Sequence, residues 1–217
     1  MQDHQLKFID LALARRALRF GQFTLKSGRE SPYFFNAGLF SDGEAIAVLG
    51  RCYAAAITRS GLGFDMLFGP AYKGIALAAS TAAALFDHHG RNVPYAFNRK
   101  EAKSHGEGGN LIGAPLAGWV LVIDDVVTAG TAVRESIDLI RAAGAECVGC
   151  VFALDRQERG RGELSATQEI EREHALKCLS VLTLADLIEA LSSPGVAAIS
   201  AEQLAALKAY RQRYGVA

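Results

Sequence analysis

The sequence predicts an α/β fold in which helices flank a mainly parallel, twisted sheet. Between about residues 66 and 154, short apolar stretches alternate with amphipathic stretches of helical length. Strands that alternate with helices in this way indicate crossover connections between parallel strands. The stretch WVLVI (119–123) is apolar at every position, which is typical of a central parallel strand covered on both faces.

The elements expected before this region are a helix, a hairpin and a second helix. Apolar residues recur every three or four positions over 5–20, and Gly21 follows, so we expect a helix that ends there. The hairpin spans QFTLKSGRESPYFFNAG (22–38), with Ser27 and Gly28 at its turn. The second helix begins at Ser41 or Asp42 and runs to about residue 60. The remaining expected elements are strands at 66–68, 93–97, 119–123 and 147–154, and helices near 74–89, 131–143, 183–191 and 201–213.

Composition indicates one globular domain that does not bind a partner through its overall charge. The chain has 217 residues, of which 50% are hydrophobic, and its 23 basic and 23 acidic side chains balance. This balance argues against a nucleic-acid or membrane surface that acts through overall charge. The uncharged stretches at 74–86 and 111–123 are too short to span a bilayer. The N-terminal residues lack an uninterrupted apolar signal core, so we expect a cytoplasmic protein.

The four cysteines do not indicate a disulfide scaffold. Cys147 and Cys150 have a C-x-x-C spacing inside an expected strand. Positions three apart on a regular strand point to opposite faces, so we expect buried structural thiols and not a shared metal site.

The segment 98–113, NRKEAKSHGEGGNLIG, interrupts the alternation of strands and helices. Loops of this length are uncommon in compact domains and often have a function. Its cationic and imidazole side chains, together with its glycines, favour a lid that closes on an anion; a solvated insertion is the alternative. Those side chains belong to Arg99, Lys100, Lys103 and His105.

The segment VLVIDDVVTAGTA (120–132) carries the clearest chemical signal. Asp124 and Asp125 follow a buried strand, at the edge where open α/β sheets bind ligands. Residues 128–131 then form a small-residue turn before a helix, where backbone N–H groups and the helix N-terminus can hold a phosphate. Carboxylates beside such a phosphate-binding turn suit a sugar phosphate, because the carboxylates can accept hydrogen bonds from sugar hydroxyls while the turn holds the phosphate. The alternative is that the acids cap a turn and Gly130 only starts a helix.

The stretch IDDVVTAGTA (123–132) resembles the motif that binds 5-phosphoribosyl 1-diphosphate (PRPP) in type I phosphoribosyltransferases. Other segments narrow the resemblance to orotate phosphoribosyltransferases of the stand-alone bacterial type, in that family's order and close to its spacing. These segments are FTLKSGRESPYFFNAG (23–38), FGPAYKGI (68–75), FNRKEAKSHGEGGNLIG (97–113) and FALDRQERG (152–160). The resemblance extends to about residue 160, with small departures at Val127 and Ser104.

The resemblance implies a type I phosphoribosyltransferase fold in a single domain, 1–217. A small N-terminal hood of helix and hairpin would span 1–40, and a PRPP-binding core 41–160 with the lid at 98–113. A C-terminal segment would span 161–217. The family transfers ribose 5-phosphate from PRPP to N1 of orotate, giving orotidine 5′-monophosphate and diphosphate, a step of pyrimidine (UMP) biosynthesis. It uses Mg²⁺, held mainly by the substrate diphosphate and water, and acts as a homodimer whose lid reaches the neighbouring active site.

The resemblance also assigns roles to residues. The implied PRPP ligands are Lys26, Tyr72, Lys73, Arg99, Lys100, Lys103, His105, Asp124, Asp125, Val126, Val127, Thr128, Ala129, Gly130, Thr131 and Ala132. The implied orotate ligands are Phe34, Phe35, Thr128 and Arg156, which suit a planar ring that bears a carboxylate. The implied catalytic groups are Lys100, Lys103, Asp124 and Asp125.

Two alternatives remain open on the residues alone. One is a phosphoribosyltransferase for a purine base. The hairpin aromatics and Arg156 favour an acidic pyrimidine over it, because a neutral purine has no carboxylate to pair. The other is a regulator that senses PRPP without catalysis, which we would expect to lack the lid cations or to carry a basic surface.

Overall fold

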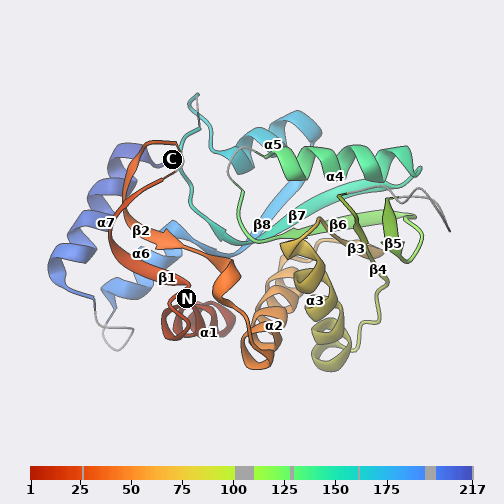
Figure 1. Cartoon of the computed structure of the whole chain (residues 1–217), viewed down its shortest axis with the longest axis horizontal. Coiled ribbons are helices and arrows are strands. Elements are labelled where there is room, and N and C mark those ends of the chain that lie inside the picture. Colours follow the sequence, from red (N-terminus) through yellow and green to blue (C-terminus); the bar gives the residue numbers. More distant parts are fainter. Residues whose placement is uncertain (26, 101–109, 128–129, 161, 194–198, 217) are drawn as a thin grey trace.

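A six-stranded sheet with the order β5-β4-β3-β6-β7-β8 forms the centre of the protein (Figure 1). The computed structural model describes all residues except 26, 101–109, 128–129, 161, 194–198 and 217. Neighbouring strands are parallel, except that β5 runs antiparallel to β4. The predicted mainly parallel sheet is therefore confirmed. The strands are β3 (Met66–Gly69), β4 (Tyr95–Asn98), β5 (Leu111–Gly113), β6 (Trp119–Asp124), β7 (Glu146–Asp155) and β8 (Lys177–Thr183).

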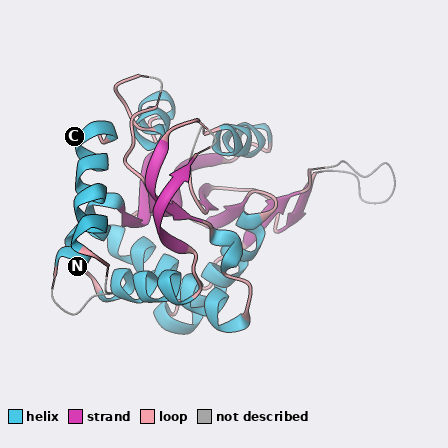
Figure 2. Ribbon diagram, turned by 60° about the vertical axis from the view of Figure 1, so that its left-hand side comes forward, coloured by secondary structure: helices cyan, strands magenta, loops and turns pink. Residues whose placement is uncertain are grey.

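Helices cover both faces of this sheet (Figures 1 and 2). On one face lie α2 (Gly43–Ser60) and α3 (Lys73–His89), with α1 (Asp3–Ala14) beside α2. On the other face lie α4 (Thr131–Ala142) and α5 (Ala166–His174). Within the described residues, no helix is both long enough and apolar enough to cross a membrane.

Two apolar clusters separate the sheet from its helices, and β6 contributes to both. Leu121 and Ile123 pack into the cluster on the α1–α3 side, whereas Val120 and Val122 pack into the cluster on the α4 side. Because successive strand residues point to opposite faces, a strand buried on both faces needs an apolar residue at every position. This explains the uniformly apolar residues 120–123, whereas Trp119 at the start of the strand is exposed.

A two-stranded hairpin and the C-terminal helices lie at one end of the sheet (Figure 1). The hairpin strands are β1 (Leu18–Thr24) and β2 (Glu30–Phe35), and the predicted turn at 27–28 is confirmed. A short 3-10 helix, η1 (Ala37–Leu39), follows. The C-terminal helices are α6 (Leu184–Ser192) and α7 (Ala201–Tyr214), and α7 packs along β2 through an edge-on contact between the rings of Tyr210 and Tyr33.

The predicted helix over 5–20 is wrong at its C-terminal end. Helix α1 ends at Ala14, and Arg16 has a left-handed backbone (φ 56°) that turns the chain into β1. Leu18 and Phe20 then pair with residues of β2 in the hairpin. Both residues fit a helical and an alternating pattern, and the long-range pairing with β2 decides between them.

Four elements of the structure were not predicted from the sequence: β5, α5, β8 and η1. Leu111–Gly113 falls within the predicted lid loop but pairs with β4. A three-residue strand has too few positions to show a period, so the sequence did not reveal it. Helix α5 carried a readable signal, since Ser165 and Gln168 form a capping box at its start. The lid segment 101–109 lies outside the described residues.

The expected opposite orientation of Cys147 and Cys150 is also wrong. A register shift between Val120 and Leu121 on β6 places an extra residue in β7, so both thiols pack into the same apolar cluster. All four cysteines are free thiols. Among the described residues, no three His, Cys, Asp or Glu side chains gather in a way that could hold a metal ion.

The close approach of α2 and α3 generates a stability prediction. A Cβ on Gly50 would lie 2.5 Å from the Ser80 carbonyl oxygen, whereas a Cβ on Gly43 in the same helix meets nothing within 4 Å. Gly50→Ala should therefore lower the free energy of unfolding by ~1–3 kcal/mol, the usual cost of overpacking. Gly43→Ala should change it by less than about 0.5 kcal/mol. Urea unfolding followed by circular dichroism measures both, and equal stability of the two variants would contradict this packing.

Candidate active site

The carboxyl ends of β3, β6 and β7 bring three predicted groups of residues to one edge of the sheet. These strands are adjacent and parallel. Lys73 follows β3, Asp124 and Asp125 stand at the end of β6, and Arg156 follows β7. The sheet topology alone therefore gathers residues that are more than 80 positions apart in sequence.

The two carboxylates at the end of β6 have different partners. Asp125 is buried, and its Oδ2 lies 2.5 Å from the Lys73 Nζ. The backbone N–H of Asp125 donates to Asp124 Oδ1 at 2.9 Å. The hydroxyl of Tyr53, on α2, donates to the Asp124 carbonyl oxygen at 2.7 Å. These contacts fix the strand end, and among the described residues Asp124 has no cation as close as the one that Asp125 has.

This difference appears in the acidity of Asp124. Burial, and then the negative charge of Asp125, raise the pKa of Asp124 to about 7, against the opposing effect of Lys73. A buried carboxylate that lacks its own cation favours its protonated form. Asp124 is therefore poised to accept a compensating hydrogen-bond donor or cation from a ligand.

The turn after Asp125 leads into α4 through Gly130. Gly130 has φ 72°, a left-handed backbone conformation that strains other residues and favours glycine. The first turn of α4 contains no acidic residue. Its N-terminus therefore favours an anion through unpaired N–H groups and the helix dipole. Val126 and Val127 are half-buried, and Thr131 and Ala132 are exposed. Thr128 and Ala129 lie outside the described residues.

The turn that carries Tyr72 and Lys73 is packed tightly against β6. A Cβ on Gly74 would lie 2.9 Å from the Ile123 carbonyl oxygen, and one on Gly69 would lie 2.0 Å from the Gly74 oxygen. The peptide bond before Tyr72 is cis. This packing holds the start of α3 beside the end of β6, which explains how Lys73 reaches Asp125.

The described ends of the lid lie next to this turn. The side chain of Asn98 accepts a hydrogen bond from the Ala71 N–H at 2.8 Å. Lys100 Nζ sits over the ring of Tyr72, 5.1 Å from its centroid, and the Arg99 N–H donates to the Asn110 carbonyl oxygen at 2.7 Å. Arg99 and Lys100 therefore lie at the base of the lid beside Tyr72. Lys103 and His105 lie outside the described residues.

The two hairpin phenylalanines point to opposite faces of β2. The Phe35 ring is buried against Phe8 and Phe40 in the core. The half-buried Phe34 ring stacks on Phe23 at a centroid distance of 5.5 Å. Of these two rings, only that of Phe34 lies outside the core. Lys26 lies outside the described residues.

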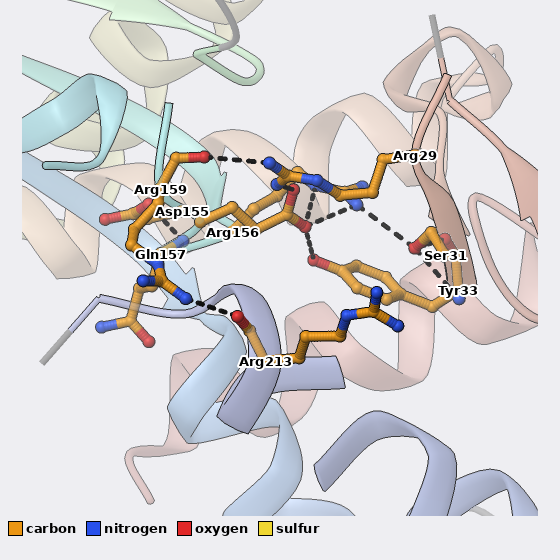
Figure 3. Close-up of polar contacts among 9 residues, drawn as sticks. Arg29, Ser31, Tyr33, Asp155, Arg156, Gln157, Arg159 and Arg213 are labelled. Carbon is orange, nitrogen blue, oxygen red and sulfur yellow. Dashed lines mark hydrogen bonds and ion pairs between the residues drawn. The ribbon is translucent and has the colours of Figure 1, made fainter. Parts of the chain in front are cut away.

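Arg156 belongs to a half-buried polar cluster between the β7 end and the hairpin (Figure 3). Its Nη2 lies 2.7 Å from Oε1 of Glu158 and donates to the Ser31 hydroxyl at 3.3 Å. Burial raises the pKa of Tyr33, so its hydroxyl keeps its proton and donates to Glu158 Oε1 at 3.4 Å. A guanidinium held in this way offers a fixed cation at the strand edge.

Three supporting residues were not identified from the sequence: Tyr53, Asn98 and Glu158. The contacts of Tyr53 and Asn98 depend on tertiary packing, and no local pattern indicates them. Glu158 stands two positions after Arg156 in FALDRQERG, and an acid so close to a candidate ligand-binding arginine was a usable signal.

Comparisons with known proteins agree with this geometry. Residues 39–171 match the model of the phosphoribosyl transferase domain. The orotate phosphoribosyltransferase of Thioalkalivibrio sulfidiphilus is 62% identical over 216 residues, which cover all of both chains. The Francisella tularensis orotate phosphoribosyltransferase structure has a TM-score of 0.86 at 41% identity and covers 96% of this chain and 98% of its own. The Mycobacterium tuberculosis enzyme in complex with PRPP has a TM-score of 0.62 at 25% identity, with coverages of 85% and 98%.

The fold and the matching family model thus define the class as a type I phosphoribosyltransferase, with a mostly parallel sheet. Within that class, the chain belongs to the orotate phosphoribosyltransferase family. The family of purine-base enzymes is not favoured, because the full-length relatives are named for orotate.

The acidity of Asp124 generates a pH prediction. Its folded-state pKa of about 7 lies above the ordinary 3.8, so stability is lost as the pH rises from about 4 through about 7. Asp124→Asn should remove this penalty and raise the unfolding free energy on the order of 2–4 kcal/mol at pH 8, and less at pH 5. Thermal unfolding of the ligand-free protein across pH 5–8 measures the difference.

Asp138→Asn on α4 serves as the control, because Asp138 is exposed. Its effect should be small and nearly independent of pH. A stabilisation by Asp124→Asn that does not grow with pH would contradict the raised pKa.

Proposed function

We propose that this chain transfers ribose 5-phosphate from PRPP to N1 of orotate, releasing diphosphate and forming orotidine 5′-monophosphate. The observation that carries the proposal is the placement of Asp124 and Asp125 beside the Gly130 helix start, on the same sheet edge as Arg156. The carboxylates that would accept hydrogen bonds from the ribose hydroxyls, the turn that would hold the phosphate and the cation that would pair with the base are thus neighbours. The reaction is a step of pyrimidine biosynthesis, which we assign to the cytoplasm.

The β6 end and the following turn would hold the ribose phosphate. Asp124 and Asp125 would accept hydrogen bonds from the ribose hydroxyls, and residues 126–132 would surround the 5-phosphate. When a ribose hydroxyl donates to Asp125, Lys73 can leave this carboxylate and turn to the diphosphate. The Lys73–Asp125 ion pair would then keep both side chains in place until the substrate arrives.

The base would lie between the hairpin and the end of β7. Arg156 would pair with the orotate carboxylate, and the Phe34 ring would offer an apolar surface to the planar base. Thr128 and Phe35 complete the proposed orotate set, although the Phe35 ring itself is in the core. Lys26, on the hairpin turn, would reach PRPP.

The chemistry requires charge stabilisation and no protein nucleophile. The bond between ribose C1 and the diphosphate oxygen breaks, the sugar gains cationic character, and N1 of orotate forms the new bond to C1. Diphosphate gains negative charge, which Tyr72, Lys73 and the cationic groups of the lid would stabilise. Those groups are Arg99, Lys100, Lys103 and His105. Closure of the lid would also exclude water, which could hydrolyse PRPP.

Mg²⁺ fits this donor set as an ion held chiefly by its substrate. It prefers oxygen ligands and keeps several waters. Asp124 and Asp125 are the carboxylates at the strand end, and one of them is already paired with Lys73. When bound, the ion neutralises charge that develops on the diphosphate. The residues of this chain position the ribose and the base around it.

We also propose that the enzyme is a homodimer in which each lid acts at the neighbouring site. The family resemblance supports this arrangement.

An ultraviolet absorbance assay tests the activity. Purified protein with PRPP and Mg²⁺ should consume orotate, and adenine, hypoxanthine and uracil should turn over far more slowly. Turnover of a purine would be consistent with the proposed PRPP site but would overturn the proposed roles of Phe34 and Arg156. PRPP binding without turnover of any base would instead support a regulator.

The lid cations generate a kinetic prediction. Lys103→Ala should lower kcat by ~10²–10³, the range for loss of one preorganised charge-stabilising donor. Steady-state kinetics at saturating PRPP and orotate measures this effect. Lys208→Ala, on α7, is the control and should keep the original kcat. An unchanged kcat in Lys103→Ala would remove this residue from the mechanism.

Mixing two inactive variants tests whether the lid acts in trans. Asp125→Asn should weaken PRPP binding, and Lys103→Ala should impair the lid. The two variants are denatured and refolded together to form mixed dimers. If each lid acts at the neighbouring site, a mixed dimer has one site with both defects and one site with none. Recovered activity therefore supports the trans arrangement. A mixture no more active than its separate components contradicts it.

A further inference from the structure

Glu158 holds one edge of the Arg156 guanidinium. Nε and Nη2 of Arg156 both contact Glu158 Oε1, at 2.8 and 2.7 Å. Nη2 also donates to the Ser31 hydroxyl, and the guanidinium carbon lies 4.4 Å from the centroid of the Tyr33 ring. None of the Arg156 hydrogen bonds to the described residues involves Nη1, although the Tyr210 hydroxyl also interacts with the guanidinium. The two N–H groups of Nη1 therefore remain for a ligand.

Glu158 is itself held in place by the hairpin. Its second oxygen, Oε2, lies 3.2 Å from Nη1 of Arg29, and its first oxygen accepts the hydroxyl of Tyr33. Its side chain is only 12% exposed. With both oxygens engaged from the hairpin, the carboxylate has little freedom to follow a moving arginine.

The backbone around Glu158 is fixed by the C-terminal end of the chain. Glu158 forms a β-bridge with Gly215. On either side of it, the Arg159 N–H donates to the Tyr214 carbonyl oxygen and the Val216 N–H donates to the Gln157 carbonyl oxygen, both at 2.9 Å. Gln157 has a left-handed backbone (φ 51°), which persists where the surroundings determine the conformation. This pairing indicates a role for the C-terminal segment, whose sequence contains no recognisable motif.

The charged side chains around Glu158 suit an anionic ligand. Arg29 and Arg156 flank the single carboxylate of Glu158, so these three side chains carry one unbalanced positive charge, and Arg159 and Arg213 lie in the same cluster (Figure 3). The nearby Asp155 is occupied elsewhere, since its oxygens accept the Gln157 N–H and the Thr167 hydroxyl. A base that bears a carboxylate would offset part of this positive charge, whereas a neutral base would leave a desolvated charge unpaired.

We propose that Glu158, clamped by Arg29 and Tyr33, is a positioning residue that aims Arg156 Nη1 at the carboxylate of the base and thereby sets the preference for an acidic pyrimidine. The inference rests on the proposed function, because it requires Arg156 to contact the base. Glu158 does not touch the substrate; it acts through the orientation of Arg156.

Direct titration with two nucleotides tests this role. Orotidine 5′-monophosphate and uridine 5′-monophosphate differ only in the base carboxylate. Glu158→Ala should weaken binding of the first nucleotide by roughly 10- to 100-fold, the range for loss of a charge-assisted hydrogen bond that orients a binding group. Binding of the second nucleotide should stay within about threefold. Equal weakening of binding of both nucleotides by Glu158→Ala would show a general structural role and overturn the proposal.

Glu158→Gln separates orientation from charge. Glutamine keeps the shape and one acceptor oxygen for Arg156 but removes the same charge as alanine does. Positioning predicts that Glu158→Gln recovers most of the affinity for orotidine 5′-monophosphate. Equal behaviour of the two variants, or tighter binding in both, would show that Glu158 acts only through its charge. Glu44→Gln, which disrupts the exposed pair with Arg15, is the matched control and should leave both affinities unchanged.

A parallel Arg156→Ala variant distinguishes the two ways in which the experiment can fail. If Arg156→Ala leaves the affinity for orotidine 5′-monophosphate unchanged, the proposed base contact itself is wrong. If Arg156→Ala weakens binding and Glu158→Ala does not, the base contact stands and the positioning role of Glu158 is overturned. An unchanged affinity for PRPP in each variant shows that the fold is intact.

Discussion

Burial of β6 on both faces is the constraint on which the rest of the molecule depends. Its residues pack alternately into the two apolar clusters, so helices on both faces hold the strand in place. The end of the strand therefore lies at a fixed place, and Asp124 and Asp125 with it. Two adjacent carboxylates there are costly by themselves, and the Lys73 ammonium and a backbone N–H offset part of that cost.

The charges around this fixed point are ordered in a way that suits the proposed substrates. The carboxylates occupy the middle of the edge, where ribose hydroxyls would lie. Lys73 and the base of the lid stand on the β3 side, and Arg156 stands on the β7 side. Diphosphate and the base carboxylate, the anionic ends of the reactants, would thus meet cations on either side. Tight glycine contacts such as Gly69 against Gly74 keep the connecting turns close to the sheet.

The hairpin and the C-terminal end together determine the base side of the site. The hairpin supplies Arg29 and Tyr33 to Glu158, and residues 214–216 pair with the segment that follows β7. The β7 end is thereby enclosed by elements from both ends of the chain. Under the proposed role of Arg156, a helix without any recognisable motif would influence recognition of the base.

The parallel sheet, most helix bounds and the strand-end position of Asp124 and Asp125 could be predicted from the sequence, because apolar periodicity and small-residue turns are local properties. Only the tertiary structure decided that 18–20 belong to β1, that Phe35 is a core residue, and that Cys147 and Cys150 share a face. Each of these depends on a partner that is distant in the chain or on a shift in strand register. The clamp around Arg156 is of the same kind, since its contacts join residues up to 129 positions apart, and no local pattern encodes such a distance.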